Sequence, residues 1–213
     1  MRYKELLQWV GHLPWFDLPM VTQGSREPKS ALVNQLARWV REGKLLSLRR
    51  GMYAWPELYR KAPLSAPSLA NVLCTPSYLS GLWALGFYGL IPEKVVTFTS
   101  ATTRVPRTFQ NALGTFRYSH LKTGFFWGTQ RLEIDGTPVL IALPEKALLD
   151  HWHLHLGEWT PQRLEEMRYQ NLDGLDLQRL QTMAERFGLP RLLRATARFL
   201  DLAEEQETGT QVL

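Results

Sequence analysis

One predicted helix, residues 29–42, carries apolar side chains on one face and polar side chains on the other. The apolar face holds Leu32, Leu36, Trp39 and Val40, and the polar face holds Ser30, Asn34, Arg38 and Arg41. In the major groove of DNA, Asn can form two hydrogen bonds to adenine, and Arg can form two to guanine. The same pattern is also typical of an ordinary surface helix, so its meaning depends on the neighbouring residues.

Basic and hydroxyl side chains flank this helix. Ser25, Arg26, Lys29 and Ser30 gather at its start, where backbone N–H groups favour phosphate. Downstream, two apolar runs enclose Arg49-Arg50-Gly51, which predicts a hairpin with two guanidinium groups at its turn. Such a hairpin can reach the DNA backbone or minor groove. The predicted DNA-contacting residues are Ser25, Arg26, Lys29, Ser30, Asn34, Arg38, Arg41, Arg49 and Arg50.

The elements that must position these residues are short and follow one another closely. Leu6, Leu7 and Val10 form the apolar stripe of a first helix, and Asp17 is a suitable N-cap for a second. A turn at residues 24–28 precedes the third helix, which Gly43 ends. Three helices followed by a basic hairpin predict a winged helix-turn-helix over residues 1–60 that binds double-stranded DNA.

The distribution of charge divides the chain into two parts. The 213 residues are 45% hydrophobic and 21% charged, which is ordinary globular composition. The net charge is +5, and the first 60 residues carry ten basic against five acidic side chains, so the whole excess lies there. This asymmetry indicates a basic module that binds a polyanion, joined to a neutral module with another role.

Composition also restricts the compartment. No apolar run approaches the roughly 18 residues that a membrane span needs. Arg2, Lys4 and Glu5 interrupt the N-terminal stretch where a signal peptide would be apolar. Cys74 is the only cysteine, so the chain forms no internal disulfide. We expect a cytoplasmic protein with no membrane partner.

Three segments are expected after the first module: a proline-containing linker at 61–68, a mixed α/β domain at 69–203 and a frayed tail at 204–213. Helices are predicted at 69–73, 77–88, 144–155, from 161, at 176–187 and at 190–202. Strands are predicted at 95–99, 116–118, 125–127, 130–134 and 139–142, with a tight turn at Asp135-Gly136. The expected fold class is therefore α+β, with an N-terminal winged helix-turn-helix and a mixed α/β C-terminal domain.

Two further groups suggest other chemistry. Glu145, Lys146 and Asp150 have the composition of a metal-dependent nuclease site, but helix capping and core positions explain them better. A possible second basic patch, touching DNA or a partner, comprises Arg104, Arg107 and Arg117. We predict no catalytic residues, no metal and no cofactor.

Three histidines alternate along one predicted helix: His151, His153 and His155. Successive members of the series point about 200° apart, so only His151 and His155 can share a metal. No third ligand is evident, since Cys74 is remote in the sequence. We therefore expect partly exposed histidines rather than a metal site.

Four stretches resemble, in the same order, segments of AbiEi-type antitoxins. They are LARWVREGKLLSLRRGMYA (36–54), ANVLCTPSYLSGLWALGFYGLIPE (70–93), TFTSATTRVPRTFQNALGTFRYSHL (97–121) and ALPEKALLD (142–150). The resemblance covers about residues 36–150. One departure follows the last stretch: the family usually continues with an aliphatic or aromatic helix, whereas this chain continues with HWHLH.

The resemblance implies a bacterial phage-defence protein with two roles. Its winged helix would repress its own operon by binding inverted repeats in the operator. Its C-terminal domain would counter a nucleotidyltransferase-like toxin as a type IV antitoxin, without forming a stable complex with it. The alternative is a transcriptional regulator whose C-terminal domain binds a ligand or a partner.

Overall fold

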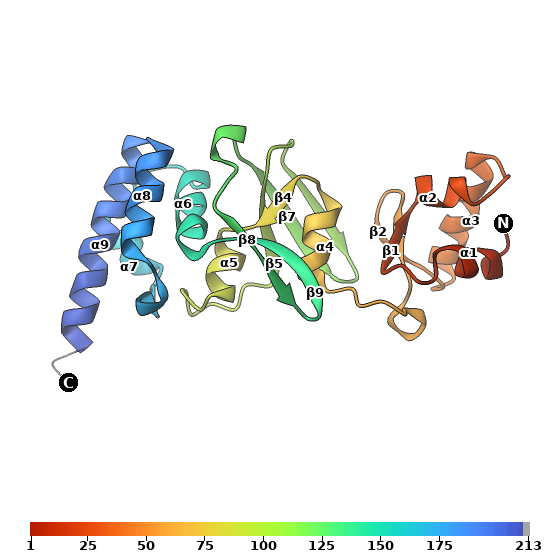
Figure 1. The fold of residues 1–213 in the computed structure, drawn as a ribbon, viewed down its shortest axis with the longest axis horizontal. Coiled ribbons are helices and arrows are strands. Elements are labelled where there is room, and N and C mark those ends of the chain that lie inside the picture. Colours follow the sequence, from red (N-terminus) through yellow and green to blue (C-terminus); the bar gives the residue numbers. More distant parts are fainter. Residues whose placement is uncertain (211–213) are drawn as a thin grey trace.

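The computed structural model describes residues 1–210, with side chains described as far as Gln206, and has an α+β fold. The molecule is elongated (Figure 1). A small N-terminal domain lies at one end, a mixed sheet lies in the middle and a group of helices lies at the other end. No helix in residues 1–210 is both long enough and apolar enough to cross a membrane.

The N-terminal domain consists of three helices and a small antiparallel sheet. In chain order its elements are α1 (Tyr3–Val10), β1 (Trp15–Asp17), α2 (Leu18–Gln23), α3 (Lys29–Arg41), β2 (Leu46–Arg49) and β3 (Met52–Ala54). The side chain of Asp17 accepts a hydrogen bond from the Met20 amide and caps α2, as the sequence predicts. Gly51 has a φ of 74° in the turn between β2 and β3, a conformation that glycine adopts without steric cost.

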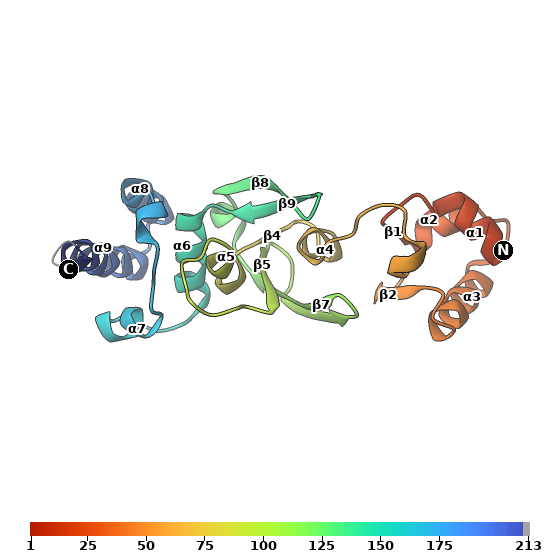
Figure 2. The ribbon, with the colours of Figure 1, turned by 90° about the horizontal axis from the view of Figure 1, so that it is seen from below.

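The sheet of this domain contains a strand that the sequence does not predict. β1 pairs with β3, which gives the order β1-β3-β2. A segment of three residues is too short to show an alternation of apolar and polar side chains, so no periodic signal marks it. The three helices lie on the side of this sheet away from the rest of the molecule (Figure 2).

After a 3-10 turn at Glu57–Tyr59 and a linker, the second domain contains six helices and six strands within residues 1–210. They are α4 (Ala66–Leu73), β4 (Ser77–Leu79), α5 (Leu82–Phe87), β5 (Thr97–Thr102), β6 (Arg107–Asn111), β7 (Gly114–His120), β8 (Thr129–Ile134), β9 (Thr137–Ala142), α6 (Pro144–Leu154), α7 (Pro161–Glu166), α8 (Leu177–Phe187) and α9 (Pro190–Thr210). The sheet order is β6-β7-β5-β4-β9-β8. Its β5–β7 and β4–β9 pairs are parallel, and its other pairs are antiparallel.

Helices cover both faces of the central sheet and form a further layer at one end. α4 lies on the face toward the N-terminal domain, and α5 and α6 lie on the opposite face (Figure 2). α8 and α9 pack beyond α6, with α7 beside α9 (Figures 1 and 2). The tight turn between β8 and β9 has positive φ at both Asp135 (51°) and Gly136 (67°), which confirms the predicted two-residue hairpin.

Several predicted elements of this domain are wrong. Residues 77–79, predicted as helix, form a buried central strand, because pairing with β5 and β9 outweighs local propensity in a segment this short. Residues 125–127, predicted as strand, lie at the end of a 3-10 turn spanning Thr123–Phe125. The edge strand β6 is unexpected. α9 extends to Thr210, beyond the predicted end at 202 and into the segment expected to be frayed, of which residues 211–213 lie outside the described chain.

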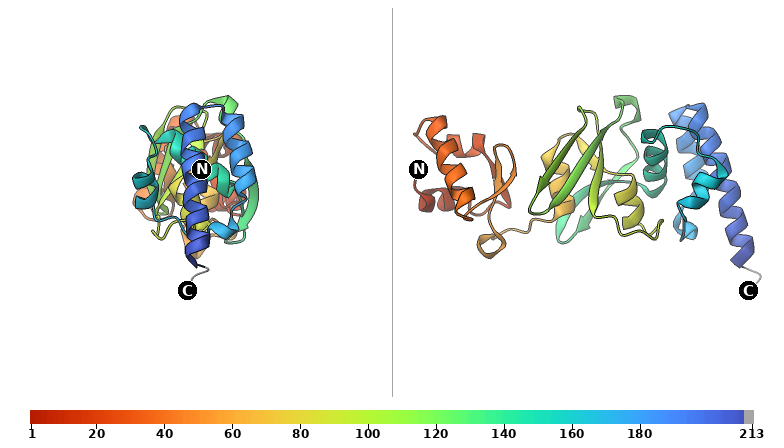
Figure 3. Two further views of the ribbon diagram at one scale, coloured as in Figure 1. Left: turned by 90° about the vertical axis from the view of Figure 1, so that its left-hand side faces the viewer. Right: turned by 180° about the vertical axis from the view of Figure 1, so that it is seen from behind.

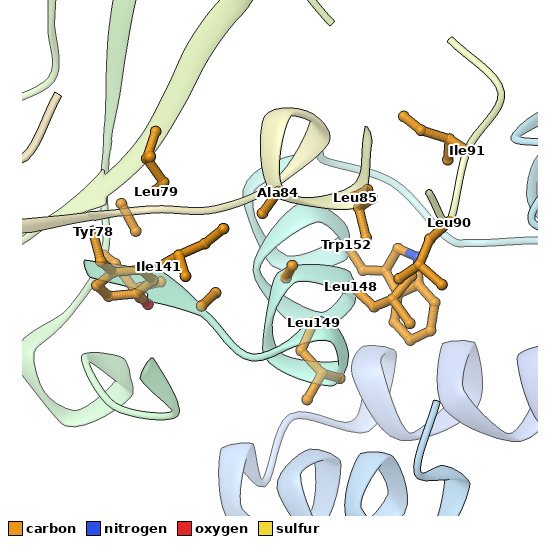
Figure 4. Packing of buried hydrophobic residues seen from close by; sticks show 14 of the residues in the cluster. Tyr78, Leu79, Ala84, Leu85, Leu90, Ile91, Ile141, Leu148, Leu149 and Trp152 are labelled. Carbon is orange, nitrogen blue, oxygen red and sulfur yellow. The ribbon is translucent and has the colours of Figure 1, made fainter. Parts of the chain in front are cut away.

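Two clusters of buried side chains hold the molecule together. The smaller lies within the N-terminal domain and contains Leu6, Val10, Phe16, Val21, Leu32, Leu36, Trp39, Leu45, Tyr53 and Trp55. The larger lies between the central sheet and its helices, where Leu148 and Trp152 of α6 meet the α5 region (Figure 4). Leu48 and Met52 of the N-terminal hairpin also belong to this larger cluster, so the hairpin packs against the second domain.

A buried ion pair joins α6 to the middle of the central sheet. Lys146 and Asp150, one helical turn apart, contact each other, and both side chains are fully buried. The Tyr78 hydroxyl donates to Asp150 Oδ2 (2.9 Å) and lies 2.9 Å from Lys146 Nζ. The Ser80 hydroxyl donates to the same carboxylate oxygen (2.7 Å). Burial lowers the pKa of Lys146, and the charge of Asp150 opposes that shift.

We expect Asp150→Ala to cost about 3–5 kcal/mol of unfolding free energy, because it leaves a buried ammonium group without its counter-charge. Urea denaturation of the full chain measures this loss. Glu93→Ala is the control, because it breaks the exposed pair with Arg168 and should change stability far less. A loss below about 1 kcal/mol for Asp150→Ala would show that the buried pair does not hold α6 in place.

Candidate nucleic-acid interface

The two faces of α3 separate as the sequence predicts. Leu32, Leu36 and Trp39 are at most 4% exposed and pack inside the N-terminal domain. The opposite face is open to solvent, and its exposed side chains are Lys29, Ser30, Asn34, Arg38 and Arg41. In the rear view of Figure 3, α3 (orange) lies on the outside of its domain. The helix therefore presents an open face on which these polar and basic side chains lie beside the exposed Val33 and Ala37.

Few acidic groups neutralise this surface. Arg38 Nε lies 3.8 Å from Glu42, a long contact between two well-exposed side chains. Glu42 also binds Lys44 at 2.8 Å, so one carboxylate serves two cations. Glu27 contacts the amino group of Met1 and accepts a hydrogen bond from Gln35 (2.8 Å). Among the side chains of residues 1–206, Lys29 and Arg41 take part in no ion pair, so both are available to an external anion.

The start of α3 leaves backbone donors without a side-chain cap. Its N-cap residue is Pro28, which provides no side-chain hydrogen bond. The Ser25 hydroxyl accepts from the Glu27 amide (3.1 Å) and shapes the preceding turn, and Arg26 beside it is exposed. Uncapped N–H groups at a helix start favour a phosphate oxygen, because they also carry the positive end of the helix dipole.

The hairpin turn is positioned differently from a free wing. The carbonyl oxygen of Gly51 accepts from the Leu18 amide (2.9 Å), which holds the turn at the start of α2. The side chain of Asn111, at the end of β6, donates to the carbonyl oxygen of Leu48 (2.9 Å). Leu48 and Met52 are each 2% exposed against the second domain. The hairpin therefore bridges the two domains.

Because the hairpin packs against the second domain, the two arginines of its turn differ in exposure. Arg50 is exposed, as expected of a residue that contacts DNA. Arg49 is only half-exposed, and its Nε is buried with no hydrogen-bond partner. Its charge acts on Tyr118 in β7, where it opposes the upward shift that burial gives the pKa of that phenol. The two arginines are therefore not equivalent. Apolar residues on both sides of the Arg-Arg-Gly turn are the one sequence signal of this contact.

The second basic patch does not form a single surface. Arg104, Arg107 and Arg117 are all exposed. However, Arg107 pairs with Tyr118 and Thr108 pairs with Arg117, so the side chains of Arg107 and Arg117 project from opposite faces of the sheet. The prediction that these arginines act together is wrong for this pair, because successive residues along a strand alternate between faces and Arg117 is one position away from Tyr118, the residue that pairs with Arg107.

The three residues with nuclease-like composition are buried and take part in two separate sets of contacts. Lys146 and Asp150 form the internal ion pair described above, and Glu145 faces α8 instead. Glu145 Oε1 accepts from the Asp176 amide (3.0 Å) and from Arg179 (2.8 Å), so it anchors the start of α8. All three side chains are 0% exposed. This arrangement offers DNA and metal no accessible carboxylate pair.

The histidines of α6 are more buried than expected. His151 is only 3% exposed, His153 is half-buried and His155 is exposed. Burial lowers the pKa of His151 to about 3, with smaller contributions from His155 and Arg163. The rings of His151 and His155 lie 4.2 Å apart between centroids, but no group of three potential ligands surrounds them in the described part of the chain. The prediction of partial exposure is therefore wrong for His151, whose ring packs against the rings of His155 and Trp159.

Compared with known proteins, this chain matches no family model, and no curated protein is significantly similar to it.

Proposed function

We propose that the N-terminal domain is a winged helix-turn-helix that binds double-stranded DNA, with α3 in the major groove. The observation that carries this proposal is the exposed stripe of α3, in which Asn34 and Arg38 lie one turn apart between the cations Lys29 and Arg41. These are the side chains that read adenine and guanine. The surplus of five positive charges in residues 1–60 supports the proposal, because it attracts a polyanion to this end of the molecule.

The contacts divide into two classes by chemistry. Asn34 and Arg38, on the middle of the helix, would contact base edges and give sequence preference. Lys29, Arg26 and the uncapped N–H groups at the helix start would contact phosphate. Arg50 would add a backbone or minor-groove contact from the hairpin. Arg49 is half-covered by the second domain and would contribute less.

The resemblance to AbiEi-type antitoxins supports a more specific proposal. In this proposal the chain is a cytoplasmic autorepressor that binds inverted repeats in its own operator. Its second domain counteracts a nucleotidyltransferase-like toxin without a stable complex. The alternative is a regulator whose second domain binds a ligand or a partner.

Substitutions on α3 should change the choice of DNA sequence. We expect Asn34→Ala and Arg38→Ala each to weaken binding to the operator roughly tenfold to a hundredfold, because each removes a two-bond contact to a base. Binding to unrelated DNA should change little. Arg131→Ala, which removes an exposed positive charge on β8, is the matched control. Gel shifts with operator and random duplexes measure both effects, and unchanged operator binding in both α3 variants would overturn the assignment of α3.

The two arginines of the hairpin should behave differently. We expect Arg50→Ala to weaken binding on every DNA sequence and to reduce the slope of log K against log salt by about 1, because one phosphate contact is lost. Arg49→Ala should alter the salt slope less, since its guanidinium is half-buried beside β6. Fluorescence anisotropy across a salt series measures the slopes. Equal slopes for wild type and Arg50→Ala would contradict a DNA contact by the hairpin.

The antitoxin role is tested through the neighbouring gene. Expression of an adjacent nucleotidyltransferase-type toxin should arrest growth, and co-expression of this chain from an unrelated promoter should restore it. The Asn34→Ala/Arg38→Ala double variant should still restore growth, because its second domain is unchanged. Failure of the wild-type chain to restore growth would favour the regulator with a ligand- or partner-binding domain.

A further inference from the structure

A small polar pocket lies between the central sheet and the C-terminal end of α6. Its volume is about 170 Å³. Its lining includes Ser80, Thr99, Arg117, Ser119, His151 and His155. Thr99 of β5 pairs with Arg117 of β7, and Ala101 pairs with Ser119, so Thr99, Arg117 and Ser119 share one face of the sheet. Because Leu82 of α5 and Leu154 of α6 also line it, the pocket lies on the face that these helices cover. α4 and the N-terminal domain lie on the other face of the sheet (Figure 2).

The charges around this pocket are positive. Arg117 lines it, and the charge of Arg163 adds to the lowering of the pKa of His151 that burial mainly causes. No Asp or Glu lines the pocket. The nearest carboxylate in sequence is Asp150, which already contacts Lys146 and accepts from Tyr78 and Ser80. The pocket therefore favours an anion over a neutral or cationic group.

Several lining groups have unused hydrogen-bonding capacity, among them the hydroxyl of Ser100, which is buried without a partner. Nδ1 of His151 is buried and has no partner, although the residue is only 3% exposed. The guanidinium of Arg117 takes part in no hydrogen bond or ion pair with any side chain or backbone group of residues 1–206. A buried polar atom without a partner costs free energy, which a hydrogen bond to a bound ligand would offset.

The other polar groups shape the pocket. Thr99 Oγ1 donates to the Ser80 carbonyl oxygen (2.6 Å) and accepts from the Trp83 amide (3.0 Å), so it is fully engaged. His155 Nδ1 lies 2.8 Å from the carbonyl oxygen of His151 and donates to it, which fixes the orientation of the His155 ring. The hydroxyl of Ser119 is a further donor on the same sheet face as Arg117.

We propose that this pocket binds a phosphate group, either as inorganic phosphate or as the head of a small phosphomonoester. The guanidinium of Arg117 provides a planar pair of donors that fits phosphate oxygens, and the hydroxyl and imidazole groups supply the remaining hydrogen bonds. The volume is well below the roughly 300–1,000 Å³ of pockets that hold drug-sized ligands, so the rest of the ligand is small or remains outside. This site is independent of DNA binding by α3.

The test uses the full chain and two probes, inorganic phosphate and glycerol 3-phosphate. Isothermal titration gives the affinity, and NMR follows the Arg117 side chain and the ring of His151. We expect saturable binding of at least one probe, with shifts confined to the pocket. The probe that binds more tightly identifies the source of the phosphate group.

Arg117→Gln should weaken this binding at least tenfold, because it removes the charge and the paired donors. Ser119→Ala should weaken it several-fold. Arg107→Gln is the matched control, because it removes the same charge from the neighbouring strand but on the opposite sheet face, and it should leave the affinity unchanged. Binding that fails to saturate for both probes, or an equal loss in the Arg107 and Arg117 variants, would overturn the proposal. Normal DNA binding by Arg117→Gln would separate this outcome from any failure of the α3 assignment.

Discussion

Burial of the Lys146 ammonium group is the constraint on which the second domain depends. A charge in this position is tolerated only with a counter-charge and saturated hydrogen bonds. Asp150 supplies the counter-charge from the next turn of the same helix. The hydroxyl of Tyr78, in β4, and that of Ser80, directly after β4, complete the hydrogen-bond network. Because the network joins one helix to one strand, it sets the position of α6 over the centre of the sheet.

The position of α6 determines where α8 begins and which residues form one wall of the polar pocket. Glu145, in the first turn of α6, holds the start of α8 through the Asp176 amide and Arg179. His151, one residue after Asp150, is placed at the wall of the polar pocket opposite Arg117. The residues that look like a nuclease site in the sequence thus act as the framework of the domain. The same framework brings a buried imidazole and an exposed guanidinium to one small cavity.

The hairpin of the N-terminal domain joins the two halves of the molecule. Leu48 and Met52 enter the core of the second domain, and Asn111 binds the backbone of Leu48. This contact covers part of Arg49 and leaves Arg50 and the exposed face of α3 at the surface. A module that presents its helix outward while its hairpin is held by a second domain would approach DNA in one orientation relative to that domain. In the proposed function, events in the second domain could reach the DNA-binding surface through this hairpin.

The sequence by itself determined the features that depend on local chemistry. The apolar stripe of α3, the Asp17 cap, and the Asp135-Gly136 turn all follow from residue type and spacing within a few positions, and the structure confirms them. Only the tertiary structure decided features that depend on distant partners. Residues 77–79 are a strand because β5 and β9 pair with them on either side. Arg107 and Arg117 project from opposite faces of the sheet because the register of β6 with β7 fixes the face that each occupies. Likewise, Arg49 is half-covered because its hairpin packs against the second domain, far away in the chain. Periodicity within one segment carries no information about such contacts.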